Sequence, residues 1–314
     1  MGVETVIGAL ARIPRAVLFE DAPCFEHWHR RFVEQACRFE RPIQWAVAGG
    51  FLSDRLGYSL AAGIQAAGRE LFPSLEPHQI AALCVTEETG AHPRQLTARI
   101  EPVAGGWRLE GRKKWSTLAP RADVLFVAAV RDRDESGRNR IVLARVERSA
   151  PGVCVRAMEP TPFAPEIEHG IVELRGVEVS EQALLPGDGY ASYIKPFRTL
   201  EDTFVAAAVG GSLLAAAWRY GFPRHAEGRV LAMLAVLDQV AQAEPDDPAA
   251  HLLLDAALSE LDALADPAAP WWARVPDRIR ELWQRDRPLL GVASRVRAQR
   301  FQRARERLGL PPDG

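Results

Sequence analysis

The spacing of apolar residues changes twice along the 314-residue chain, and this change limits the possible folds more than any other feature of the sequence. From residue 3 to about residue 72, apolar positions recur three and four apart, as in Phe32, Ala36 and Phe39, which predicts helices. From about residue 81 to residue 178 they form short runs, and helical spacing returns from about residue 201. We therefore expect an α+β multidomain fold in which a β domain lies between two helical regions of the sequence.

The middle region has the pattern of an antiparallel sheet that folds on itself. Its apolar runs are separated by turn signals, which include Gly105-Gly106, Glu110-Gly111 and the residues from Asp134 to Gly137. We predict an antiparallel, β-barrel-like domain over residues 81–190, with its last strand at 174–179 and an exit loop at 186–190.

The flanking regions are predicted to be helical over residues 1–80 and 191–314. Residues 58–71 form the clearest N-terminal helix, which should end before Pro73. C-terminal helices are expected at 205–220, 229–243 and 249–265, with a last helical stretch interrupted near Pro288. The short breaks between them are typical of an antiparallel helical bundle.

Charge and cysteine usage exclude several functional classes. The 39 Lys and Arg balance 41 Asp and Glu, so no overall field attracts nucleic acid or an anionic membrane, and the arginines at 295–307 suit a solvated helix face. The four cysteines have no CxxC spacing, and Cys24 with His27 and His29 lacks a fourth ligand, so we predict no metal site. The sequence shows neither a secretory signal nor an apolar run of about 20 residues, so we expect a cytoplasmic protein with reduced thiols.

Two segments of the middle region carry a resemblance to a known family. The first is Cys84-Val85-Thr86-Glu87 followed by Gly90-Ala91, and the second runs from Gly106 to Lys113-Lys114-Trp115-Ser116-Thr117. They resemble the two flavin-facing motifs of the acyl-CoA dehydrogenases, and the match covers about a third of the chain. The resemblance implies a helix, β-domain, helix architecture and FAD as the cofactor.

The resemblance also implies a role for each residue of these motifs. Trp115 would cover a face of the isoalloxazine ring, Thr117 would donate a hydrogen bond near the reactive nitrogen, and Ser116 lies between them. Val85 and Thr86 would contact the pyrimidine end of the ring. A flat apolar ring with polar edges needs an aromatic wall and rim donors, which these residue types supply. The alternative is that Trp115 fills the barrel core and that both threonines bond to backbone at strand edges.

The sequence departs from the family pattern at two places. Where relatives have Gly-Ser-Asp, Gly90 is followed by Ala91-His92-Pro93, so Gly90 and His92 are expected in the substrate or cofactor loop, with a surface histidine as the alternative. The reaction that the resemblance implies, α,β-dehydrogenation of an acyl thioester, needs a carboxylate base to remove the α-proton. The Glu-Gly-Thr segment that supplies this base in most relatives is not found after Pro270. Glu201 is the candidate base if the alignment shifts by one residue. Otherwise it stabilises the start of a helix.

Two functions are compatible with these features. The first is FAD-dependent α,β-dehydrogenation of an acyl thioester by a homo-oligomeric oxidoreductase. The second is a non-catalytic relative, either a partner subunit in a mixed oligomer with a related dehydrogenase or a ligand-binding scaffold that lacks a complete FAD site. Purified protein with the absorption band of bound flavin favours the first function. Colourless protein that added FAD does not stabilise against heat favours the second.

Overall fold

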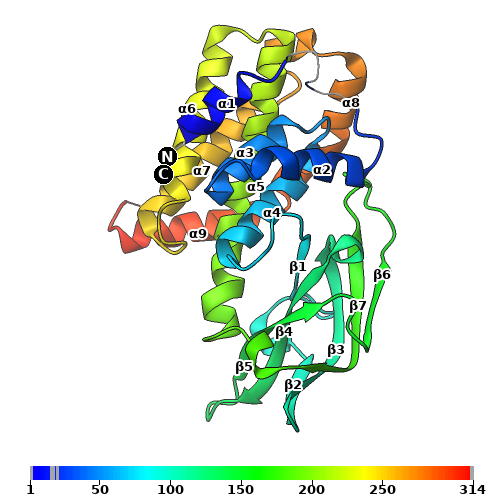
Figure 1. Cartoon of the computed structure of the whole chain (residues 1–314). Coiled ribbons are helices and arrows are strands. Elements are labelled where there is room, and N and C mark those ends of the chain that lie inside the picture. Colours follow the sequence, from blue (N-terminus) through cyan, green and yellow to red (C-terminus); the bar gives the residue numbers. More distant parts are fainter. Residues whose placement is uncertain (1–2, 15–17, 19–20, 312–314) are drawn as a thin grey trace. The chain divides into compact units, whose positions relative to one another are not determined.

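The computed structural model describes residues 3–14, 18 and 21–311, and these form helices, then strands, then helices (Figure 1). The N-terminal helices are α1 (Val3–Leu10), α2 (Phe25–Ala36), α3 (Pro42–Phe51) and α4 (Leu56–Leu71). The strands are β1 (Ala81–Cys84), β2 (Arg99–Val103), β3 (Gly106–Thr117), β4 (Val124–Arg133), β5 (Asn139–Glu147), β6 (Val153–Ala157) and β7 (His169–Val179). The C-terminal helices are α5 (Lys195–Tyr220), α6 (Arg224–Val240), α7 (Pro248–Leu264), α8 (Asp277–Asp286) and α9 (Ser294–Arg307). The predicted order of helices, strands and helices is confirmed, whereas β6 was not predicted.

The described residues divide into two compact units. The helical unit comprises Met1–Glu70, Pro162–Glu166 and Thr199–Gly314, and the β unit comprises Leu71–Thr161 and Ile167–Arg198. The short segment Pro162–Glu166 belongs to the helical unit because the buried Asp286 carboxylate accepts a 2.7 Å hydrogen bond from the Ala164 amide, and Arg285 pairs with Glu166 at 3.1 Å. The division at residues 80 and 190, drawn from sequence alone, stays a prediction.

The β unit contains one curled sheet in the order β1-β4-β2-β3-β7-β6, with β5 paired to β4 outside this order. The sheet is mixed, because β4 runs parallel to β1 and β2 while the remaining pairs are antiparallel. The predicted antiparallel pairing is therefore wrong for β4 with β1 and β2, and it holds for the other pairs. Parallel neighbours need a long connection, and the β2–β3 hairpin supplies it between β1 and β4.

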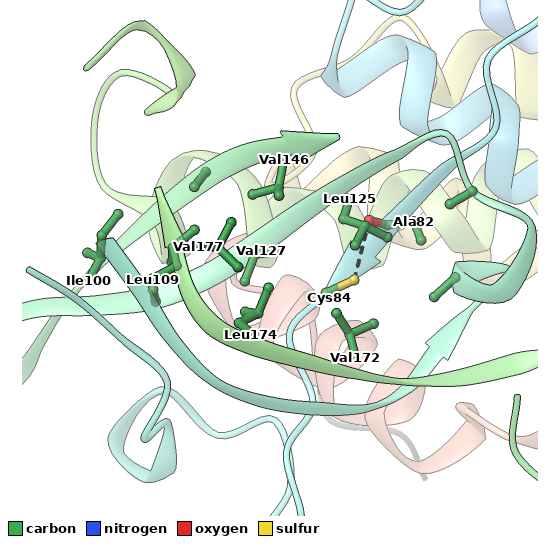
Figure 2. Close-up of a cluster of buried hydrophobic side chains, with 14 of the residues drawn as sticks. Ala82, Cys84, Ile100, Leu109, Leu125, Val127, Val146, Val172, Leu174 and Val177 are labelled. Atoms are coloured by element: carbon green, nitrogen blue, oxygen red, sulfur yellow. Dashed lines mark hydrogen bonds between the residues drawn. The ribbon is translucent and has the colours of Figure 1, made fainter. Parts of the chain in front are cut away.

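Apolar side chains form two buried clusters in the β unit. Inside the curl, strands β1 to β5 and β7 contribute a buried cluster of small and branched side chains around Cys84, Leu125 and Val172 (Figure 2). A second cluster covers the other face of β4 and β5, where Phe72 stacks on Phe126 at 3.6 Å between ring centroids. Since β4 is buried on both faces, it appears in the sequence as a continuous apolar run instead of an alternating one.

Gly111 lies inside β3 and does not form the turn predicted for Glu110-Gly111. The pairing of β3 with β7 shifts between Leu109 and Gly111, and Gly111 has φ +146°. A Cβ atom at this position would lie 2.5 Å from the Cβ of Ala98. Glycine therefore allows a β-bulge and a close approach to the neighbouring chain, and the strand continues.

Helices α3 and α5 of the helical unit approach each other through glycine. A Cβ atom on Gly50 would lie 1.7 Å from the carbonyl oxygen of Ala208, and one on Gly211 would lie 2.2 Å from that of Val47. The stretch Tyr190–Tyr220 is long and apolar enough to span a bilayer, but 89% of its most apolar window is buried. This degree of burial is typical of a core helix of a folded domain.

Helix α5 starts earlier than expected. It begins at Lys195, after the π-turn Tyr190–Ile194, whose first amides are capped by the Asp188 carboxylate at 3.0 Å from Tyr190 N and 2.6 Å from Ala191 N. Glu201 therefore lies in the second turn of α5 and not at its start, which removes the helix-dipole explanation for this residue.

The C-terminal arginines also differ from expectation. On α9, the Arg297 guanidinium lies 2.8 Å from the buried Asp202 carboxylate, and Arg300 pairs with the same carboxylate. The expected solvated helix face is wrong for these two residues, because they neutralise a buried charge on α5.

Candidate functional site

A β-bulge at the end of β3 turns Trp115 away from the core of the β unit. Between the paired residues Lys113 and Ser116 of β3 lie two residues, Lys114 and Trp115, opposite the single residue Ile171 of β7. Trp115 adopts the left-handed conformation with φ 57°, and its side chain is 49% exposed. The alternative interpretation, in which Trp115 fills the barrel core, is therefore wrong. Bulges often reorient a side chain next to a binding site.

Two further motif residues, Thr86 and Thr117, lie next to this bulge. The Thr86 carbonyl accepts a 2.8 Å hydrogen bond from the Lys114 amide, so the end of the first motif is next to Trp115. Thr117 pairs with His169 on β7, and its hydroxyl lies 3.2 Å from His169 Nδ1. Thr86, Trp115 and Thr117 are thus brought together within one unit.

The side chains of Val85 and Ser116 point into the β unit. Val85 belongs to the second apolar cluster, and its carbonyl accepts from Lys113 Nζ at 3.4 Å. Ser116 is buried beside the Cys84 thiol, whose pKa burial raises to about 11 against smaller opposing effects of Ser116 and Lys113. Either residue can contact an external ligand only through its backbone.

A buried ion pair underlies the bulge, and sequence reasoning missed it. Lys113 is 0% exposed, and its Nζ lies 2.7 Å from Oε1 of the buried Glu87. The carboxylate also accepts from the Thr97 amide and hydroxyl at 2.8 and 2.6 Å and from the Ala98 amide at 3.0 Å. Glu87 of the first motif is therefore an anchor that joins its own loop to β3.

The two members of this pair respond to burial in opposite ways. Burial raises the pKa of Glu87, but Lys113 and the hydrogen bonds from Thr97 and Ala98 outweigh it, and the net pKa lies below its ordinary value. Burial lowers the pKa of Lys113 against the opposing effect of Glu87. Because the folded carboxyl has the lower pKa, its stabilisation is complete above about pH 4.3 and is lost as the pH falls further.

The loop after Glu87 forms one wall of an open cavity of about 840 Å³. Gly90, with φ +112°, closes a tight turn onto Glu87 through two 3.0 Å backbone hydrogen bonds, and His92 Nδ1 accepts from the Arg94 amide at 3.2 Å. The lining includes the basic side chains His92, Arg94, Arg131, Arg138 and Arg140. Its acidic members are engaged locally, since Asp134 binds its own turn and Asp188 caps the π-turn. Since Arg131 and Arg140 also pair with Asp132, the suitability of the cavity for an anion rests on Arg94 and Arg138.

The candidate base Glu201 lies in the helical unit, next to a carboxylate that is already paired. Asp202 is held by Arg297 and Arg300 of α9, whereas Glu201 is half-buried on the adjacent position of α5. Glu201 remains the carboxylate of this turn that the sequence selects as the candidate base. Among the residues that the structure describes, no three His, Cys, Asp or Glu side chains gather as a metal site.

Known proteins resemble this chain most clearly in the β unit. The acyl-CoA dehydrogenase middle-domain family matches residues 82–177. The probable acyl-CoA dehydrogenase FadE10 of Mycobacterium tuberculosis is 30% identical over 131 residues, which are 41% of this chain but 20% of that protein. Glutaryl-CoA dehydrogenase of Desulfococcus multivorans is 28% identical over 206 residues, covering 62% of this chain and 51% of the relative.

Solved structures extend the likeness over the whole fold. Glutaryl-CoA dehydrogenase of Mycobacterium smegmatis covers 99% of this chain and 95% of its own with a TM-score of 0.68 at 14% identity. An FAD complex of PigA covers 98% and 92% with a TM-score of 0.64 at 15% identity. The order of elements and the curled sheet are those of the acyl-CoA dehydrogenase fold. Residues 82–177 of the chain thus match the middle domain of the acyl-CoA dehydrogenase family, and the likeness over the remaining residues is one of fold.

Proposed function

We propose that this protein binds FAD and catalyses the α,β-dehydrogenation of an acyl thioester. The observation that supports this most directly is the half-exposed Trp115 on a bulge beside Thr86 and Thr117. Residues held in the left-handed conformation cluster at ligand-binding sites, and this one presents an exposed indole. Its neighbours supply the hydroxyl and backbone groups that the edge of a flavin needs.

The residues of the β unit fit the flavin in defined roles. Trp115 covers a ring face, the Thr117 hydroxyl donates to the ring edge, and backbone groups of Val85, Thr86 and Ser116 meet its polar end. When bound, the flavin supplies the acceptor for the substrate's hydride. The cavity bordered by His92 and Arg94 offers cationic side chains to the phosphates of a thioester carrier such as coenzyme A.

Replacing Trp115 by alanine tests the ring site. Trp115→Ala should raise the Kd for FAD about 10-fold, because stacking of two aromatic systems contributes about 0.5–1.5 kcal/mol beyond burial of area. Fluorescence titration of FAD into apoprotein measures it. Trp107→Ala is the control, since this indole lies at the other end of β3 and donates to Glu181. An unchanged Kd in Trp115→Ala contradicts the assigned face.

Replacing Glu201 by glutamine tests the base. We propose that a Glu201 carboxylate oxygen accepts the α-proton, so Glu201→Gln should lower kcat at least 100-fold, in line with loss of general-base catalysis. The absorption spectrum and amount of bound flavin should stay unchanged. Glu281→Gln, at an exposed position of α8, is the matched control. If Glu201→Gln has the same kcat as wild-type protein, another group is the base.

The setting that fits this function is the cytoplasm, with the chain as a homo-oligomer or in a mixed oligomer with a related dehydrogenase. A non-catalytic partner subunit or ligand-binding scaffold is the alternative outcome. Purified protein that is colourless and gains no thermal stability from added FAD supports that alternative, because a ligand that binds only the folded state must raise its stability.

A further inference from the structure

His169 is a half-buried imidazole that contacts both side chains assigned to the flavin ring. It is the first residue of β7 and pairs directly with Thr117 of β3. Its Nδ1 lies 3.2 Å from the Thr117 hydroxyl, and its ring centroid lies 5.7 Å from that of Trp115 at 66° between planes. One side chain therefore meets the aromatic wall and the rim donor of the proposed site.

The edge-on contact bears on the orientation of Trp115. The bulge leaves two residues of β3 opposite one of β7, so backbone pairing alone does not fix the indole. An edge-on ring at 5.7 Å between centroids has the geometry of a favourable aromatic pair. The imidazole thus supports the outward indole from the side of β7.

The hydrogen bond decides which way the Thr117 hydroxyl can donate. A hydroxyl has one proton and two acceptor positions. If Nδ1 carries the proton of the neutral imidazole, it donates to Thr117 Oγ1, and the hydroxyl proton is available to an acceptor outside the strand. If Nδ1 is bare, it accepts that proton, and the hydroxyl has none left for a ligand.

The surroundings favour a neutral ring. Burial lowers the pKa of His169 below its ordinary value, and no charged group opposes this. Charged side chains on the elements packed against it are paired with one another: Lys114 with Glu88, Arg121 with Glu168, and Arg156 with Glu173. At neutral pH the imidazole therefore exists as one of the two tautomers described above.

We propose that His169 is a positioning residue of the flavin site, in which Nδ1–H donates to Thr117 Oγ1 and so directs the Thr117 hydroxyl proton toward the ring edge, while the imidazole holds the Trp115 indole. This inference rests on the proposed FAD site. It adds a residue that neither motif contains and that sequence analysis did not select.

The hydrogen bond can be tested in the apoprotein. Nitrogen-15 NMR of the histidine side chains, with His169 assigned by its loss in His169→Asn, should show the Nδ1-protonated neutral tautomer at pH 7. Thr117→Val should shift these resonances. The Nε2-protonated tautomer in wild-type protein overturns the proposal, because Nδ1 would then be an acceptor.

Binding of FAD provides the second test. His169→Phe keeps a ring beside Trp115 but removes the donor, and should raise the Kd for FAD about 5- to 10-fold and shift the absorption band of bound flavin. His169→Asn places an amide donor near Nδ1 and should restore most of the affinity and the band. In a Thr117→Val background, His169→Phe should have no further effect, since the two residues act through one hydrogen bond.

The outcomes separate the two proposals. Wild-type protein that binds no FAD overturns the proposed function and this inference together. Wild-type protein that binds FAD, with equal affinity and spectrum in His169→Phe, overturns the inference alone. Additive losses in the double variant also overturn it.

Discussion

Glu87→Gln should lower the free energy of unfolding by about 3–5 kcal/mol at pH 7, although it hardly changes the size of the side chain and leaves one oxygen that accepts hydrogen bonds. The substitution leaves the fully buried Lys113 without its counter-charge, and loss of one partner of a buried pair costs this much. The buried Lys113 ammonium can avoid the cost of an unpaired charge only by losing its proton. For a lysine of ordinary pKa about 10.4, this costs about 4–5 kcal/mol at pH 7 and sets an upper limit.

The adjacent glutamate provides a matched control. Glu88 pairs with Lys114 at 2.8 Å, nearly the same distance as the buried pair, but its side chain is 64% exposed. Glu88→Gln should therefore change stability by less than about 0.5 kcal/mol. Thermal and urea unfolding measure both variants. Equal effects of the two substitutions contradict a role for burial.

The pH dependence of Glu87→Gln identifies the mechanism. Its folded state binds fewer protons at Lys113 than its unfolded state, so its stability should rise with pH relative to wild type, by up to about 1.4 kcal/mol per unit between pH 7 and 9. The double variant Glu87→Gln, Lys113→Met lacks the buried amine and should regain most of the free energy of unfolding that Glu87→Gln loses. A pH-independent loss, unchanged by Lys113→Met, assigns the effect to packing instead.

Gly50→Ala should destabilise the helical unit by about 3 kcal/mol or more, although alanine is the better helix former. The added Cβ would lie 1.7 Å from the carbonyl oxygen of Ala208 and 2.4 Å from its carbonyl carbon, so α3 and α5 must move apart. Overpacking in a filled core typically costs about 1–3 kcal/mol, and backbone atoms cannot rotate away as a side chain can.

The same substitution at an exposed glycine should have the opposite sign. A Cβ on Gly228, within α6, meets nothing within 4 Å. Gly228→Ala should stabilise the protein by about 0.5–1 kcal/mol, since alanine loses less backbone freedom on folding. Chemical unfolding of the two variants compares them directly. Stabilisation by Gly50→Ala would show that the helices are less closely packed than described.

Much of the fold could be predicted because its causes are local. The spacing of apolar residues depends on the period of each helix or strand, so the order of elements and the approximate bounds of α4 and α7 were within reach of the sequence. The errors came from elements whose role depends on a neighbour. Gly111 has the composition of a turn, but its close approach to Ala98 makes it a bulge within β3.

The candidate site could be predicted in part. The sequence contains Thr86, Trp115 and Thr117 as two motifs, and the resemblance relates both motifs to one cofactor. It carries no sign that Ser116 points inward and Trp115 outward, because this depends on how two residues of β3 face one of β7. The only available signal for the Glu87–Lys113 pair was a lysine at a position that the alternation of β3 makes buried.

The sequence by itself determined the order of elements, the two motifs and the balanced charge, since these depend on residues near one another in the chain. Only the tertiary structure decided which distant residues meet: Lys113 with Glu87 across 26 positions, His169 with Thr117 across 52, and Arg297 with Asp202 across 95. The physical reason is that the free energy of a buried charge or hydrogen bond depends on its partner and on exclusion of water, and both are properties of the folded chain.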